Sequence, residues 1–86
     1  MKPYVVVTFS STHAAMRAED IFKELKLDFE LIPTPREISA ECGFALLVRQ
    51  KDTQELEKIC REYMINYDGI HLVKEEKGKK YYEKSY

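Results

Sequence analysis

The fold is decided by the stretch YVVVTFSSTHAAMRAEDIFKEL, residues 4–25. Its first six residues form a β-branched and aromatic run, which is typical of a strand. Residues that favour helix N-caps follow at Ser10, Ser11 and Thr12. Apolar residues then recur at steps of three and four over residues 14–25, which indicates an amphipathic helix. This stretch therefore predicts a strand that runs directly into a helix.

The rest of the chain continues the alternation of strands and helices. Further strands are predicted at Phe29–Ile32, Phe44–Val48 and Ile70–Val73, with Phe29 and Leu31 on one face of the second strand. A second helix is predicted after Asp52, which is placed to cap it. The apolar stripe of this helix consists of Leu56, Ile59, Cys60, Tyr63 and Met64.

This order of elements is βαββαβ, the ferredoxin-like split βαβ arrangement. We therefore expect an α+β domain in which two helices cover one face of a four-stranded antiparallel sheet. The second face is expected to be partly open and to carry His71, and an open face on a small domain is a surface for a homodimer. A sheet with a swapped fourth strand is the alternative arrangement.

The chain is predicted to form a single domain over residues 1–74. Residues 75–86 are rich in lysine and tyrosine and fit either a frayed tail or an extension of the last strand. We favour the tail, because chain termini are usually loose.

Composition excludes several classes of protein. The 86 residues are 34% charged with a net charge of −1, so no basic excess indicates a nucleic-acid partner. No apolar run approaches the ~18 residues of a membrane span, and no signal peptide is recognised at the N-terminus, so a cytoplasmic location is expected. The two cysteines do not make a disulfide framework, and without a CxxC motif no zinc or other metal site is predicted.

The dipeptide Cys42-Gly43 is the most informative feature for function. Thr34 and Glu37 are spaced as a capping box at the start of a short helical turn. Gly43 is predicted to end that turn in the left-handed conformation, with Cys42 as its last residue. The residues predicted to shape the turn are Pro33, Thr34, Pro35 and Gly43.

The predicted topology brings Cys42 to the edge of the sheet where the first helix begins. Free N–H groups at a helix N-terminus favour an anion, and a thiolate or persulfide is such an anion. The negative pole of its own short turn acts against this effect. The residues predicted to stabilise the anion are Ser10, Ser11, Thr12, His13 and Arg36.

Each of these residues also has a simpler interpretation. Cys42 fits a small buried hydrophobe, which is what most free cysteines are. His13 fits a solvated residue of a first helical turn, and Cys60 lies on the apolar stripe, where packing is favoured over chemistry.

The sequence resembles a family of small bacterial domains, the putative selenium/sulfur carrier-like proteins. The resemblance covers roughly residues 4–73 and rests on three stretches of the sequence. They are TFSSTH at residues 8–13 with Ala14 and Glu19, IPTPREIS at residues 32–39, and Cys42-Gly43 with the apolar strand that follows.

The resemblance implies a function. In that family the cysteine that matches Cys42 is the proposed carrier residue, which holds selenium or sulfur as a persulfide-type adduct and passes it on by thiol exchange. This would be a group carrier without metal or organic cofactor, not a turnover enzyme. Its partners would be a cysteine desulfurase or selenocysteine lyase as donor and a sulfur-carrier or selenium-handling protein as acceptor. The alternatives are a non-catalytic module that binds an anion or peptide and a structural dimerisation domain.

Overall fold

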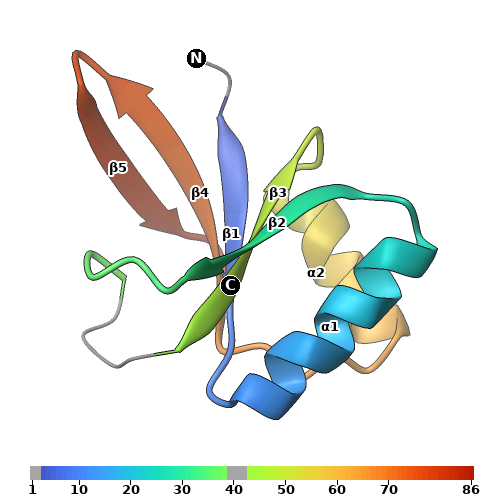
Figure 1. Cartoon of the computed structure of the whole chain (residues 1–86). Coiled ribbons are helices and arrows are strands. Elements are labelled where there is room, and N and C mark those ends of the chain that lie inside the picture. Colours follow the sequence, from blue (N-terminus) through green and yellow to red (C-terminus); the bar gives the residue numbers. More distant parts are fainter. Residues whose placement is uncertain (1–2, 39–42) are drawn as a thin grey trace.

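The computed structural model describes residues 3–38 and 43–86, which form one antiparallel sheet and two helices. The elements are β1 (Tyr4–Thr8), α1 (Thr12–Glu24), β2 (Asp28–Pro33), β3 (Phe44–Arg49), α2 (Thr53–Glu62), β4 (Gly69–Glu76) and β5 (Lys79–Lys84). The strand order is β2-β3-β1-β4-β5, and all neighbouring strands are antiparallel (Figure 1).

The predicted α+β class is confirmed, but the expectation of a four-stranded ferredoxin-like sheet is wrong by one strand. β5 pairs along β4, so residues 75–86 contain a strand and not only a tail. The two strands are joined at Lys77 and Gly78, which both have positive φ, as the twist of a tight hairpin turn requires. Lys74 and Glu83 add an ion pair of 3.7 Å between the strands.

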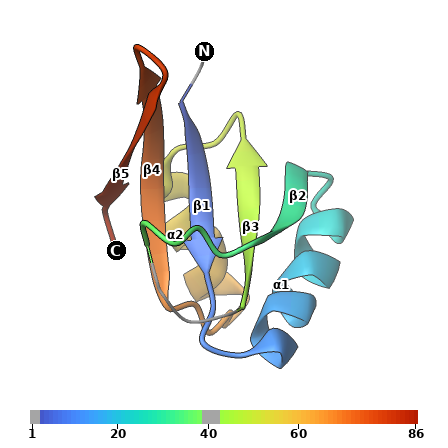
Figure 2. The same cartoon turned by 60° about the vertical axis from the view of Figure 1, so that its left-hand side comes forward.

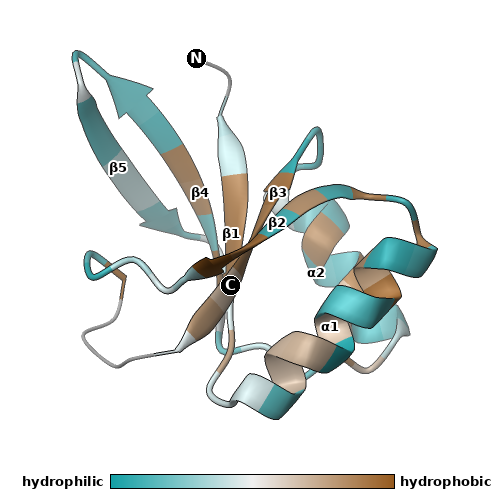
Figure 3. Ribbon diagram, in the orientation of Figure 1, coloured by the Kyte–Doolittle hydropathy of each residue, from teal (hydrophilic) through white to brown (hydrophobic). Residues whose placement is uncertain are grey.

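Both helices pack on one face of the sheet, which we call the helix-covered face. Alternate strand residues such as Val5 and Val7 join Phe22 of α1 and Leu56 of α2 in a continuous buried core. The ring of Phe22 meets Phe29 of β2 edge-to-face, with centroids 5.9 Å apart. Figure 3 shows apolar residues along β1 and β3, whereas the β4–β5 hairpin is mostly hydrophilic.

The second helix is shorter than its predicted apolar stripe. Leu56 and Cys60 are buried as expected, but α2 ends at Glu62. Tyr63 and Met64 are exposed, because Tyr63 is the C-cap and Met64 takes a left-handed φ of 52° that ends the helix.

The opposite side of the sheet, the helix-free face, is less open than predicted. The loop after β2 crosses it in front of β3 and β1 (Figure 2). Ile38 of this loop packs with Val6, Ala45 and Val73. The loop also reaches the β5 side, where burial and the carboxylate of Glu37 raise the pKa of Tyr82.

Candidate functional site

The segments predicted to surround the functional thiol meet at one edge of the sheet. Thr8, the last residue of β1, pairs with Ala45 of β3 on one side and with Gly69 of β4 on the other. Asp68 N donates to Thr8 O at 2.7 Å, which holds the connection from α2 against the end of β1. α1 also begins at this edge (Figures 1 and 2). The end of β1 and the starts of β3, β4 and α1 therefore lie at one edge of the sheet, and the location of Cys42 at this edge stays a prediction.

The N-terminus of α1 is built as the sequence predicts. Ser11 is the N-cap, and its Oγ accepts a hydrogen bond from Ala14 N at 3.1 Å. The backbone N–H groups of Thr12 and His13 lie in the first turn of the helix, where N–H groups have no acceptor within the helix. This first turn contains no acidic residue. The residues from Ser10 to His13 are all exposed, so this helix end faces solvent at the predicted edge.

Gly43 lies at the base of the loop, and its left-handed conformation stays a prediction. Gly43 O accepts a hydrogen bond from Thr34 N at 3.0 Å. This bond continues the pairing of Pro33 with Phe44 by one step and closes the base of the loop. The pairing of β2 with β3 therefore holds the carbonyl group of Gly43.

The described part of the predicted capped segment contains a turn. Ile38 N donates to Pro35 O at 3.0 Å, and residues 36–38 are turn and not helix. Cys42, the predicted acceptor, lies outside the described residues. Its described neighbour in the sequence is Gly43.

Arg36 is not brought to the N-terminus of α1. The loop that carries it crosses the helix-free face, whereas α1 packs on the opposite face (Figure 2). Arg36 is exposed, and a role for it at the same anion as Ser10–His13 gains no support from this arrangement.

The second cysteine is placed where thiol chemistry is suppressed. Cys60 is 1% exposed in the core between α2 and the sheet. Burial, together with the nearby carboxylate of Glu57, raises the pKa of its thiol to about 12. Because the thiolate is the reactive form, Cys60 is inert at neutral pH.

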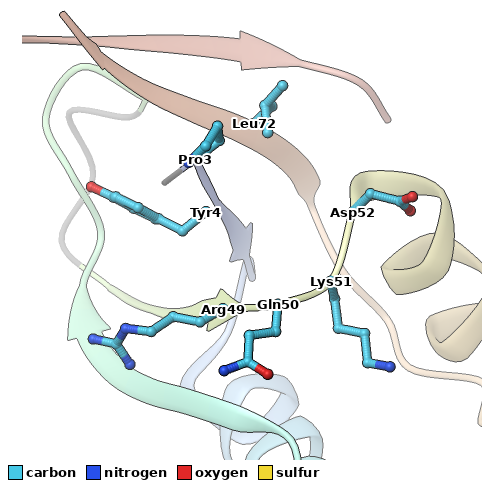
Figure 4. A pocket seen from close by; sticks show the side chains of 7 residues that line it. All are labelled: Pro3, Tyr4, Arg49, Gln50, Lys51, Asp52 and Leu72. Atoms are coloured by element: carbon cyan, nitrogen blue, oxygen red, sulfur yellow. The ribbon is translucent and has the colours of Figure 1, made fainter. Parts of the chain in front are cut away.

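A cavity of about 840 Å³ lies elsewhere, near the start of β1 and of α2 (Figure 4). Its two cationic side chains are already paired. Arg49 bonds to Asp28 and Glu30, and Lys51 Nζ lies 3.4 Å from Glu55. The cavity is at the edge of the sheet opposite to the candidate site and has no part in it. It is lined by Pro3, Tyr4, Arg49, Gln50, Lys51, Asp52 and Leu72.

Sequence reasoning missed the close contact between Gly69 and His71 at the candidate edge. A Cβ on Gly69 would lie 2.9 Å from His71 Cε1, so the imidazole occupies the space above this glycine. Thr8 Oγ1 donates to Gly69 O at 3.3 Å beside it. The available signal was the spacing of glycine and histidine two residues apart in one strand, which places both on the same face.

Comparisons with known proteins give a family and a relative for this chain. The family described as "Putative Se/S carrier protein-like" matches residues 4–72. A protein of Aquifex aeolicus (strain VF5) named "Putative sulfur carrier protein" is 37% identical over 82 residues. That match covers 93% of this chain and 40% of the relative, so the chain spans less than half of the relative's length. No solved structure matches the chain.

Neither helix in the described residues has the length and apolar content needed to cross a membrane.

Proposed function

The chain belongs to the "Putative Se/S carrier protein-like" family, and we propose that it holds sulfur or selenium on Cys42 and relays it between partner proteins. The observation that carries this proposal is the protection of Cys60. The sequence has two cysteines, and the one in the core has a pKa of about 12. Carrier chemistry on a thiol of this chain therefore falls to Cys42.

The proposed transfer is a thiol exchange in which the cargo keeps its oxidation state. The Cys42 thiolate attacks the terminal sulfur of a donor persulfide, a new S–S bond forms, and the donor cysteine leaves as a thiolate. An acceptor thiolate then attacks the terminal sulfur on Cys42, which leaves as a thiolate in turn. With selenium the same bonds form and break at a perselenide. The chain thus acts as a group carrier and not as a turnover enzyme.

The surroundings of the edge support an anionic adduct. The exposed N-terminus of α1 presents the N–H groups of Thr12 and His13, and the Thr34–Gly43 hydrogen bond fixes the residue that follows Cys42. Backbone N–H groups at a helix N-terminus stabilise negative charge. Ser10 and Ser11 belong to this helix end, whereas Arg36 lies in the loop that crosses the helix-free face.

The proposed partners follow from the chemistry. The donor must present a persulfide or perselenide, as a cysteine desulfurase or selenocysteine lyase does, and the acceptor, a sulfur-carrier or selenium-handling protein, must present a thiolate. We also propose a reducing, cytoplasmic setting, because free thiols persist there.

Mass spectrometry of the intact protein tests the function. The chain is incubated with a cysteine desulfurase and cysteine, or with a selenocysteine lyase and selenocysteine, and compared with Cys42→Ala and Cys60→Ala. We expect the wild type and Cys60→Ala to gain one chalcogen atom and Cys42→Ala to gain none. Equal loading of Cys42→Ala and the wild type would overturn the proposal.

A further inference from the structure

β5 is an edge strand of the sheet, and its outer side has no strand partner among the described residues. On its inner side it pairs with β4 along its whole length. The pairing of β4 with β1 ends at Val73, opposite Tyr4, so the far part of the β4–β5 hairpin projects beyond β1 and away from the helices (Figure 1). A two-stranded hairpin is only marginally stable by itself, so a further strand on β5 would stabilise this arm.

The hairpin turn determines which backbone groups of β5 face outward. The two-residue turn at 77–78 has positive φ at both residues, a geometry in which the residues on either side exchange both backbone hydrogen bonds. Hydrogen-bonded and non-hydrogen-bonded pairs then alternate, so the odd-numbered residues of β5 bond to β4. The bond from Ser85 N to Ile70 O at 2.9 Å continues this alternation. The residues whose N–H and C=O groups point away from β4 are therefore Lys80, Tyr82 and Lys84.

The side chains of β5 alternate between the two faces of the hairpin. Tyr82 lies on the helix-free face, because it pairs with Val73 and packs with the apolar cluster there. Lys79, Tyr81 and Glu83 therefore share the other face, and all three are exposed. Tyr81 is 50% exposed and has the lysine two residues before it and the glutamate two residues after it. This pattern is complementary to itself when the strand is reversed.

We propose that β5 pairs antiparallel with β5 of a second copy of this chain, about a two-fold axis at Tyr81. In this register, Tyr81 lies opposite Tyr81 of the second copy, and Lys79 lies opposite Glu83 of the second copy on both sides of the axis. Lys80 exchanges backbone hydrogen bonds with Tyr82 of the second copy, which uses the outward-facing groups. Aromatic pairs and opposite charges directly across two strands are both stabilising.

The charges of β5 favour this register over its neighbours. An axis at Tyr82 would place Lys80 opposite Lys84 of the second copy, and an axis at Lys80 would place this lysine opposite itself. Like charges directly opposite each other are destabilising. Lysines on an edge strand discourage pairing with unrelated strands. The single acidic residue, Glu83, makes this edge complementary to one register of its own sequence.

The other edge strand, β2, fits a second copy less well. Its last residue, Pro33, has no backbone N–H, and its charged residues, Asp28 and Glu30, are both acidic. Pairing through β5 would join the two sheets into one continuous sheet with the helices of both copies on the same side. A contact made by one strand from each copy is smaller than a permanent dimer interface, so the association is weak and depends on concentration. It does not depend on the chemistry proposed for Cys42.

Sedimentation equilibrium of the whole chain tests the pairing with two charge-reversal variants. Glu83→Lys leaves this face of β5 with two positive charges and Lys79→Glu leaves it with two negative charges, so each variant should repel its own copies. We expect the dissociation constant of the dimer to rise at least about tenfold in each variant. An equimolar mixture of the two should regain the association of the wild type, because opposite charges then face each other at both positions. Lys23→Glu, the same change at an exposed position of α1, should have no effect.

Amide hydrogen exchange shows which surface associates. The amides of Lys80 and Tyr82 should become protected as the concentration rises, whereas that of Tyr81, which bonds to β4, should be protected at every concentration. A wild-type chain that stays monomeric at millimolar concentration would overturn the proposal, as would growth beyond a dimer or protection of β2 in place of β5. Unchanged association in Glu83→Lys, or a mixture that associates no better than its components, would overturn it as well. If a variant does not fold, the exchange of Lys80 and Tyr82 in the wild type decides alone.

Discussion

The two faces of the sheet are covered in different ways. On the helix-covered face, residues such as Val5, Phe22 and Leu46 are fully buried by two helices in one continuous core. On the helix-free face, Val6, Ala45 and Val73 are covered in part by one residue of a loop. The first arrangement supplies most of the apolar burial, whereas the second places a loop and a histidine where small changes in charge or volume alter the packing.

Removing a large side chain from the helix-covered face should have the largest effect. Phe22 is 0% exposed, and Phe22→Ala should lower the free energy of unfolding by about 3–5 kcal/mol. Ile38→Ala, the matched truncation on the helix-free face, should cost clearly less because Ile38 is only half-buried. Urea denaturation of both variants measures the contrast, and equal losses would mean that the two faces contribute alike.

Filling the space above Gly69 should have the next largest effect. A Cβ there lies 2.9 Å from His71 Cε1, and overpacking of this kind costs about 1–3 kcal/mol. In a double-mutant cycle, Gly69→Ala should be less destabilising in the His71→Ala background than in the wild type. Additive effects in the denaturation measurements would show that the ring and the glycine are not in close contact.

The pH dependence of stability should follow His71. Its folded pKa is lowered, so the unfolded chain takes up the proton more readily than the folded chain. The contribution of His71 to the free energy of unfolding is complete above about pH 6.5 and is lost as the pH falls through the folded pKa. The slope of this loss is at most about 1.4 kcal/mol per pH unit. Denaturation of the wild type and His71→Gln at a series of pH values should show this slope in the wild type alone. If the slope persisted in His71→Gln and vanished in His13→Gln, the pH dependence of stability would come from His13 and the prediction would be wrong.

The smallest effect is expected at Gly43. A Cβ at this position would lie 3.7 Å from Thr34 Oγ1, an ordinary contact. Gly43→Ala should therefore change the free energy of unfolding by less than about 1 kcal/mol, and a gain is allowed because alanine restricts the unfolded chain. Gly78→Ala is the control, since Gly78 has a φ of +80° and should lose stability. A larger loss at Gly43 than at Gly78 in the same urea series would contradict this expectation and support the left-handed cap.

The strands β1–β4 and the two helices were predictable because their apolar periodicity is local and strong. Ser11 and Asp52 follow the same local rules and cap the helices as expected. β5 was not predicted, since KKYYEK has no alternating pattern and its pairing depends on β4 and on the Lys77-Gly78 turn.

The path of the loop also depends on contacts that local rules do not describe. Local rules around Thr34 and Glu37 favour a capped helical turn, but the Thr34–Gly43 bond and the packing of Ile38 on Val6 and Val73 are contacts between distant parts of the chain. The choice of Cys42 rests on the sequence and the family, and the structure adds the burial of Cys60. A single sequence gives no direct signal for such non-local contacts.

Mapping the position of the transferred atom tests the account most directly. The wild-type chain is loaded by a cysteine desulfurase, its persulfide is alkylated, and the peptides are analysed by mass spectrometry. We predict that the added sulfur is found on the peptide that contains Cys42, while Cys60 remains an unmodified thiol until the chain is unfolded. Sulfur on Cys60 in the folded chain, or on neither cysteine, would contradict the account.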